Sequence, residues 1–189
     1  LILILLIMNS MKNNFKLLIA AVALLAVGCS KSNPHLDHAL QMKEKIYKLY
    51  DVDETPLLAE NYPQDVAAEA TYLAEGADNK VNKYSYLWPY SGTLSMMSAL
   101  YEATGDESIL EFIDNEVIAG LKMYHDTSRE PYGYSSYITA DKSDRFYDDN
   151  IWLGIDFTDL YLLTGNKEYL AKAEEIWKFI ASGLDNRPD

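Results

Sequence analysis

Two consecutive carboxylates, Asp148 and Asp149, are the residues of this sequence best suited to chemistry. A pair of carboxyl groups in different environments can divide the work of catalysis, because one stays ionised while the other keeps a proton. Such a pair can act as nucleophile and acid/base on a glycosidic bond. An acid pair also suits the N-terminus of a helix, so plain helix capping is the competing interpretation.

The helical spacing of the residues that follow favours the catalytic interpretation. At about 100° per residue, one stripe of the helix predicted over 148–163 carries Asp148, Asp149, Trp152, Asp156 and Asp159. The rest of this helix is apolar, and buried carboxylates cost free energy unless they are paired or solvated. We therefore expect the stripe to face a water-filled cleft. Because adjacent side chains on a regular helix diverge, pairing of the two aspartates also calls for an irregular first turn.

The elements that position this pair are predicted to be helices, since helical periodicity recurs from Leu36 onward and strand alternation never persists. The predicted helices span residues 36–50, 64–75, 90–104, 107–122, 148–163 and 167–182. The connection over residues 123–147 is long, and connections of that length in a compact domain are usually functional.

An internal repeat organises these helices, because residues 100–110 align with residues 160–170. Each copy holds a glycine, Gly105 or Gly165, that can end one helix. Each then holds Asp106 or Asn166, which can cap the next helix. Helices joined by so short a turn pack as antiparallel hairpins, and repeated hairpins indicate an array or a toroid.

The two helices of each predicted hairpin differ in character. Segments 90–104 and 148–163 are largely uncharged or apolar all round, whereas 107–122 and 167–182 each carry one apolar stripe. A helix that is apolar all round is buried, and one with a stripe lies at the surface. Alternating buried and surface helices predict two concentric layers, an (α/α) barrel. A solenoid of about 34-residue repeats is the main competitor, but its period does not fit.

A family resemblance becomes specific around the aspartate pair. The run Phe146-Tyr147-Asp148-Asp149-Asn150-Ile151-Trp152-Leu153-Gly154 resembles the consecutive-aspartate motif of glycoside hydrolase family 76, and residues 160–170 resemble the helix turn that follows it there. The upstream Trp88-Pro89-Tyr90-Ser91-Gly92 and Thr104-Gly105-Asp106 stand in the expected order. The resemblance covers residues 36–189.

This resemblance implies an all-α protein, an (α/α)6 barrel of which about half, the N-terminal half, is present in this chain. It implies a retaining endo-α-1,6-mannanase, with Asp148 as nucleophile, Asp149 as acid/base, and Asn150 and Trp152 shaping the site. It also implies a truncated fragment that is inactive by itself. Exo action and transglycosylation stay open at this point.

Aromatic residues near the pair are the predicted sugar contacts, because aromatic faces stack on sugar rings, although aromatics equally fill cores. The candidates are Trp88, Tyr134, Tyr137 and Tyr147, together with Asn150 and Trp152. The expected ligand is α-mannan or a mannose-containing oligosaccharide. A second hypothesis, from a different class, is a cell-surface lipoprotein that binds glycans without catalysis.

The charge balance and the remaining motifs exclude several other classes. A formal net charge of −13 disfavours nucleic acid and anionic substrates, because both are repelled. His35 and His38 lack partners for a metal site, and the spacing of Asp141, Asp144 and Asp148 misses the EF-hand pattern. The sequence holds no glycine-rich phosphate loop. We expect neither a metal nor a cofactor.

The N-terminus has the layout of a secretory signal. A charged start at Met11–Lys16 precedes an apolar run over residues 17–27, and Ala26-Val27-Gly28-Cys29 resembles a bacterial lipobox. We expect a signal over residues 1–28, with 1–10 an upstream extension, a lipidated tether over 29–35, and the catalytic domain over 36–189. Lipidation of Cys29 would place the protein in the cell envelope, anchored to a membrane on its periplasmic or outer side. A secreted soluble protein with an unmodified cysteine is the alternative.

Overall fold

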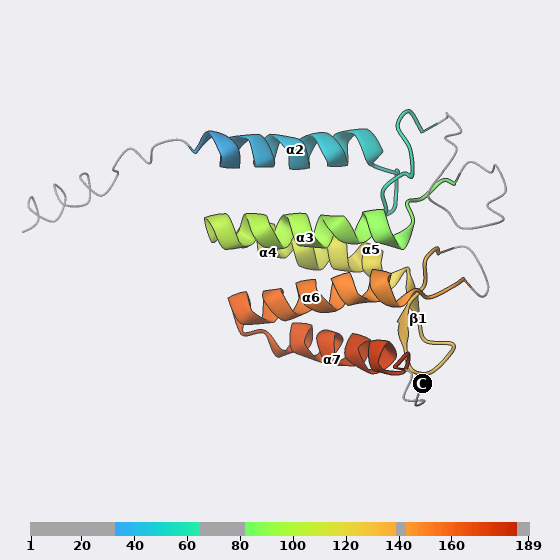
Figure 1. Ribbon diagram of the computed structural model, residues 1–189. Helices are drawn as coiled ribbons and strands as arrows, with labels where there is room; N and C mark the ends of the chain where they lie inside the picture. Colours follow the sequence, from blue (N-terminus) through green and yellow to red (C-terminus); the bar gives the residue numbers. More distant parts are fainter. Residues whose placement is uncertain (1–32, 65–81, 139–142, 185–189) are drawn as a thin grey trace, which may run out of the picture. The chain divides into compact units, whose positions relative to one another are not determined.

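The computed structural model describes residues 33–64, 82–138 and 143–184. By internal contacts the chain divides into two units, Leu1–Asp37 and His38–Asp189, and the second holds nearly all the described residues. Its elements follow one another along the chain as in Figure 1: α2 (Pro34–Tyr50), α3 (Leu87–Thr104), α4 (Glu107–Phe112), η1 (Ile113–Val117), α5 (Ile118–Lys122), β1 (His125–Asp126), β2 (Gly133–Tyr134), α6 (Tyr147–Thr164) and α7 (Lys167–Ala181).

Both predicted hairpins form, and both use the predicted turn. Gly105 ends α3 with a φ of 63°, and Gly165 ends α6 with a φ of 71°, in the left-handed region that glycine adopts at little cost. Asp106 then caps α4, and Asn166 caps α7, each accepting a hydrogen bond from the backbone N–H two residues later. The repeat therefore works through the same local chemistry in both copies.

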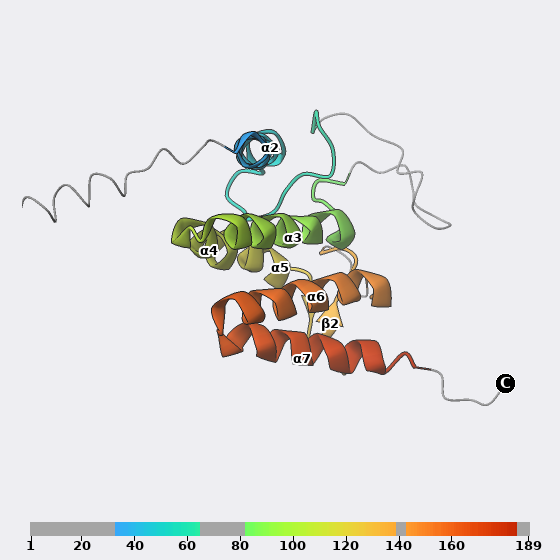
Figure 2. The same cartoon turned by 60° about the vertical axis from the view of Figure 1, so that its left-hand side comes forward.

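In the stack of hairpins, α6 lies between α3 and α7 (Figure 2). Helix α6 packs against both α3 and its own partner α7, while α4, η1 and α5 pack against α3. The Ser95 hydroxyl of α3 donates to a carboxylate oxygen of Asp156 of α6 at 2.7 Å. The Tyr169 hydroxyl of α7 donates to Asp114 of η1 at 2.6 Å. These contacts pair the two inner helices of the predicted layers, α3 with α6, and join the outer ones through η1 and α7.

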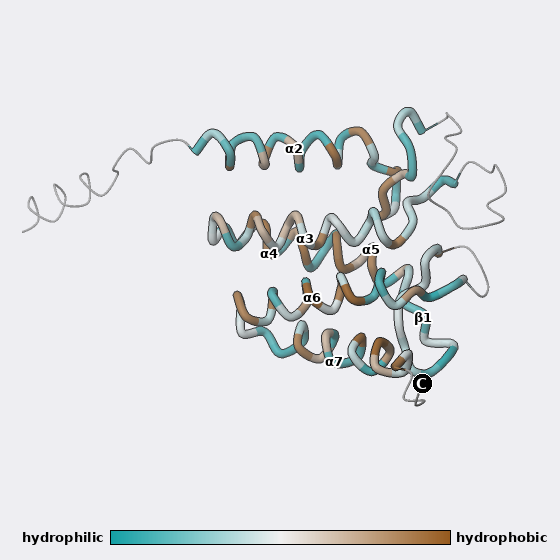
Figure 3. The backbone as a smooth tube through the Cα atoms, in the orientation of Figure 1, coloured by the Kyte–Doolittle hydropathy of each residue, from teal (hydrophilic) through white to brown (hydrophobic). Residues whose placement is uncertain are grey.

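The core between these layers is apolar, and α3, the helix of η1 and α5, α6 and α7 all contribute buried side chains to it. Helix α7 alternates hydrophilic and hydrophobic positions along its length, as expected of a surface helix (Figure 3). The largest fully buried side chains within the helices include Leu94, Met97, Ile113, Leu121, Leu153, Phe157 and Leu160. Burial of such side chains supplies most of the favourable free energy of a fold this size.

The outer helix of the first hairpin differs from the single helix predicted over residues 107–122. It is interrupted by a π-helical turn, η1, in which the N–H of Ile118 donates to the carbonyl of Ile113. The first and last residues of this turn, Ile113 and Val117, are both fully buried. Residues four positions apart share a face in a regular α-helix as well, so helical periodicity alone does not reveal this wider turn.

Helix α6 is buried on one side only, which corrects the prediction of burial all round. Asn150, Leu153, Asp156, Phe157 and Leu160 make up its buried face. Ile151, Trp152 and Ile155 are exposed on the other side.

Several predicted features lie outside the described residues. These are the signal over residues 1–28, Cys29 with most of its tether, and, apart from Gln64, the helix expected over residues 64–75. Within the part of the chain that the structure describes, no helix combines the length and the apolar character that crossing a membrane requires.

Replacing the glycine at the second hairpin turn should destabilise the protein. Gly165→Ala places a β-carbon on a backbone with a φ of 71° and should lower the free energy of unfolding, measured by urea denaturation, by about 1 kcal/mol. The matched control is Gly92→Ala inside α3, where a β-carbon would meet no atom within 4 Å. That change should raise the free energy of unfolding by up to about 1 kcal/mol. Equal effects of the two substitutions would contradict the turn mechanism.

Candidate active site

The aspartate pair lies in the first turn of α6, which begins at Tyr147. The residue before the helix, Phe146, offers no side-chain cap. The first turn is nevertheless an ordinary α-helical one, in which the N–H of Asn150 donates to the carbonyl of Phe146 at 3.3 Å. The irregular first turn that we expected is therefore not found. Asp148 and Asp149 instead project from a regular helix whose positive dipole end favours their charge.

The two carboxylates have different surroundings. Asp148 is exposed, whereas Asp149 is partly buried. Burial raises the pKa of Asp149 to about 6, and the neighbouring negative charge of Asp148 raises it further in the same direction. A carboxyl group with this pKa holds its proton under mildly acidic conditions. The pair thus offers a partly buried carboxyl with a raised pKa beside an exposed carboxyl on the adjacent residue.

The acid stripe continues along α6 into a groove between α3 and α6. Asp156 is nearly buried and accepts the hydrogen bond from Ser95. Burial raises its pKa to about 6, while the Ser95 hydroxyl lowers it and the charge of Asp159 raises it. Asp156 and Asp159 line the groove together with Ser95, Ser98 and Glu102, and its volume is about 300 Å³. Two acids of the predicted stripe, Asp156 and Asp159, therefore do face a solvent-accessible hollow.

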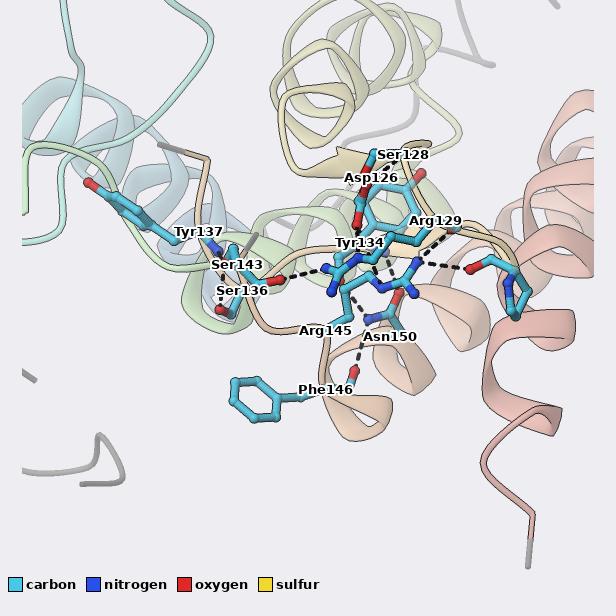
Figure 4. Close-up of polar contacts among 11 residues, drawn as sticks. Asp126, Ser128, Arg129, Tyr134, Ser136, Tyr137, Ser143, Arg145, Phe146 and Asn150 are labelled. Atoms are coloured by element: carbon cyan, nitrogen blue, oxygen red, sulfur yellow. Dashed lines mark hydrogen bonds and ion pairs between the residues drawn. The ribbon is translucent and has the colours of Figure 1, made fainter. Parts of the chain in front are cut away.

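The connection before α6 is a folded loop held by charged side chains (Figure 4). It contains a short antiparallel ladder of β1 and β2, which periodicity did not predict. Asp126 accepts from the guanidinium of Arg129 at 2.7 Å. Arg145 donates to the carbonyls of Arg129 and Pro131 at 3.0 and 2.9 Å. Sequence reasoning missed these three charged residues, although two arginines in a connection that also holds several acids were an available signal.

Asn150 joins this loop to the helix that carries the aspartates. Its side chain is 0 % exposed. The amide oxygen accepts from the Tyr134 N–H at 2.7 Å, and the amide nitrogen donates to the carbonyls of Tyr134 at 2.9 Å and Phe146 at 2.8 Å (Figure 4). Every donor of the amide is therefore used within the protein. The expected substrate contact of Asn150 is not available in this arrangement.

The predicted sugar-stacking aromatics divide into exposed and internal residues. Trp88 on the first turn of α3 is 56 % exposed, and Trp152 on α6 is 52 % exposed. Tyr147 is also exposed, although one face of its ring stacks on Phe179 with the ring centres 5.0 Å apart. Trp88 follows directly on Leu87, whose N–H donates to the carbonyl of Ser136 in the loop before α6. The starts of α3 and α6 are thus tied to the same loop.

The remaining two candidates are held inside the protein. Tyr134 is 2 % exposed, so its ring presents almost no surface to a ligand. Tyr137 is half-buried, lies 5.0 Å from the ring of Tyr86, and accepts from the N–H of Tyr84 at 3.4 Å. Both differ from the expectation of open stacking platforms, because they pack within the protein around the loop that precedes α6.

Within residues 33–64, 82–138 and 143–184 no group of three or more histidine, cysteine, aspartate or glutamate side chains is arranged to hold a metal ion.

Comparison with known proteins gives this arrangement a family. The family model described as glycosyl hydrolase family 76 matches residues 39–188. No curated protein matches the chain. A solved family 76 glycoside hydrolase, a mannosidase from Bacteroides thetaiotaomicron VPI-5482, is similar with a TM-score of 0.62 and 26 % identity, over 78 % of this chain and 37 % of that one.

Two further solved structures agree. A family 76 glycoside hydrolase from a bovine strain of Bacteroides thetaiotaomicron is similar with a TM-score of 0.60 and 25 % identity, over 78 % of this chain and 29 % of that one. An α-mannanase of the same family from Bacteroides thetaiotaomicron shares the fold, with a TM-score of 0.62 and 23 % identity, over 86 % of this chain and 40 % of that one. The chain therefore spans well under half the length of the structures it matches.

The stacked hairpins described above are accordingly part of the helical barrel that these enzymes share. The family match covers most of the chain and includes the run from Phe146 to Gly154 with its two aspartates. The chain belongs to glycosyl hydrolase family 76.

Proposed function

We propose that this chain is the N-terminal part of a glycoside hydrolase that cleaves the α-1,6-mannosidic linkages of mannan with retention of configuration. The observation that carries the proposal is the pair at the start of α6. Asp149 is partly buried with its pKa raised to about 6, directly beside the exposed Asp148. Two neighbouring carboxyl groups in different surroundings are what a retaining glycosidase requires.

The chemistry assigns one role to each carboxyl. Asp148, as carboxylate, attacks the anomeric carbon and forms a glycosyl ester, while Asp149 gives its proton to the departing glycosidic oxygen. Asp149, now ionised, then takes a proton from water, whose oxygen attacks the same carbon and releases Asp148. Two displacements restore the original configuration. Trp88, exposed on the first turn of α3, and Trp152, exposed on the second turn of α6, are the proposed sugar platforms.

The substrate class rests on the relatives. The similar structures are named a mannosidase and α-mannanases, one of them an α-1,6-mannanase from a Salegentibacter species. The formal charge of −13 also suits a neutral polysaccharide better than an anionic one. We include in the proposal an envelope location through lipidation of Cys29, which rests on the run Ala26-Val27-Gly28-Cys29 alone.

An apolar groove on the second hairpin bears on how much of the enzyme this chain supplies. The groove lies along α6 and α7, has a volume of about 570 Å³, and is lined by residues that include Ile151, Ile155, Glu174, Trp177 and Ile180. Exposed apolar surface of this kind marks a site of interaction.

The internal repeat indicates which kind of segment would pack into the groove. Asp114, which accepts from Tyr169 of the following hairpin, aligns with Glu174 of the groove. Val117, which is 0 % exposed, aligns with Trp177, which is 63 % exposed. One position through which the first hairpin contacts the second, Asp114, is thus repeated as Glu174 in the groove, and a buried position of the first hairpin is repeated as an exposed tryptophan. We propose that the groove receives a further hairpin of the barrel, and that the catalytic unit needs it.

Removing each carboxyl in the complete enzyme should separate the two roles. Asp149→Asn should lower hydrolysis of α-1,6-mannan by about 100-fold to 10,000-fold, the range expected for loss of an acid/base. It should retain formation of the glycosyl ester from an aryl α-mannoside with a good leaving group, because such a group departs without a proton. Asp148→Asn should abolish turnover of both substrates, since no nucleophile remains.

The control for this experiment is oligosaccharide binding, measured by calorimetry, which both variants should keep. Normal hydrolysis of mannan by both variants would reject the catalytic pair. Binding without hydrolysis by the parent enzyme would favour the non-catalytic glycan-binding alternative.

The pH dependence of hydrolysis should show the raised pKa of Asp149. This group is protonated below a pH of about 6 and loses its proton above it, so kcat/KM should fall as the pH rises through about 6. Stability follows the same direction, because a carboxyl whose folded pKa is raised stabilises the fold at low pH and ceases to do so as the pH rises through that value. The fall of kcat/KM with rising pH should disappear in Asp149→Asn when the aryl substrate is used. If the fall persists in that variant, a group other than Asp149 causes it.

The chain by itself should not hydrolyse mannan. Residues 29–189, purified and incubated with α-1,6-mannan, should release no reducing ends, because the uncovered groove leaves the barrel and its substrate cleft incomplete. A complete family 76 enzyme, assayed in parallel, provides the positive control. Clear turnover by residues 29–189 would show that the catalytic unit is smaller than proposed.

A further inference from the structure

Asn150 stands out among the residues around the aspartate pair because it is buried, polar and fully bonded to backbone. Its amide oxygen accepts a hydrogen bond from the N–H of Tyr134, and its amide nitrogen donates to the carbonyls of Tyr134 and Phe146. These three bonds span 16 and four positions along the chain. One side chain therefore ties together the loop strand β2 and the start of α6.

The ladder of β1 and β2 explains why Tyr134 needs this partner. His125 pairs with Tyr134 in the ladder. In the adjacent pair, the N–H of Ser135 donates to the carbonyl of Tyr124 at 2.8 Å. In an antiparallel ladder such bonds alternate, so the polar groups of Tyr134 turn away from β1. The amide of Asn150 meets them as a neighbouring strand would, with one acceptor and one donor.

The same contacts fix the helical turn that carries the two carboxyls. Asp148 and Asp149 lie between Phe146 and Asn150 in the sequence. The side chain of Asn150 donates to the carbonyl of Phe146 and so bridges the turn that carries both aspartates. On the preceding side Arg145 donates to the carbonyls of Arg129 and Pro131 in the same loop. The turn is therefore anchored to the loop at both of its ends, while its first residue lacks any side-chain cap.

We propose that Asn150 is a positioning residue, which orients Asp148 and Asp149 by clamping the first turn of α6 to the backbone of Tyr134. The inference rests on the proposed function for its effect on turnover, but the geometry that it describes does not depend on that function. Asn150 does not touch substrate in this role. It acts by limiting where the carboxyls can point, and misplacing a reacting group by about 1 Å can cost on the order of 100-fold in rate.

The variants Asn150→Ala and Asn150→Asp test this role in the complete enzyme. Alanine removes all three bonds, and an ionised aspartate has no N–H for the carbonyls of Tyr134 and Phe146. Each variant should lower kcat, per folded enzyme, by about 10-fold to 100-fold, with KM changed far less, because orientation and not binding is lost. The folded fraction is measured by circular dichroism.

The matched control is Asn166→Asp, the same change at the start of the next helix. Asn166 caps α7 by accepting from the N–H of Glu168 at 3.0 Å, a bond that a carboxylate also makes. This control should keep the parental kcat and KM.

A second readout needs no activity. In the chain itself, carbon-13 NMR of the Asp149 carboxyl should show a titration midpoint that falls toward the ordinary aspartate value in Asn150→Ala, because a loosened turn exposes the carboxyl to water. A parent enzyme that fails to hydrolyse mannan would reject the proposed function and leave this titration to decide the positioning role. A folded Asn150→Ala variant with the parental kcat, or with the parental midpoint, would overturn the inference.

Discussion

Asp149 is held partly out of water, next to a second negative charge, at the start of a helix that no side chain caps. A carboxyl in that position would relax toward solvent if its backbone were free to move, because burial and a like charge both disfavour ionisation. The rest of the described structure prevents that movement. Packing against α3 and α7 fixes the direction of α6, and hydrogen bonds to the loop before it fix its first turn.

The two hairpins reach this result from the same local plan but contribute different parts. At the start of α3 the exposed residue is Trp88, and at the aligned position of α6 it is Asp148. One repeat thus offers an aromatic surface where the other offers a carboxylate. The two repeats thus differ in what the first turn of each inner helix carries, while the turn between the helices is kept the same.

Local features of the fold were predictable because their causes are local. Gly105 and Gly165 end helices through their own backbone freedom, and Asp106 and Asn166 cap through bonds to residues two positions away. The π-helical turn at Ile113–Val117 was not predictable, because it depends on which face meets the neighbouring layer. The exposed side of α6 was missed for a related reason, since apolar residues there cannot be told from core residues by pattern.

The residues of the candidate site divide in the same way, into those identified from local sequence and those whose roles depend on contacts distant in the sequence. Asp148 and Asp149 were found from their residue type, their spacing and the run around them. The structural role of Asn150 depends on Tyr134, 16 positions earlier, and that of Arg145 on two backbone carbonyls of the loop. Contacts of this kind leave no periodic trace in a sequence. The same limit explains why Tyr134 and Trp88, both aromatic candidates, have opposite exposures.

The guanidinium of Arg145 has an electrostatic consequence for the reaction. One of its nitrogens donates to the carbonyls of Arg129 and Pro131, and another lies 3.7 Å from a carboxylate oxygen of Asp126, whose negative charge balances that of the guanidinium. The charge that raises the pKa of Asp149 is the carboxylate of Asp148. In the proposed reaction a neutral sugar gains little from such a negative charge, whereas a ring that develops oxocarbenium character gains directly. The site would then distinguish the transition state from the bound substrate by charge as well as by shape.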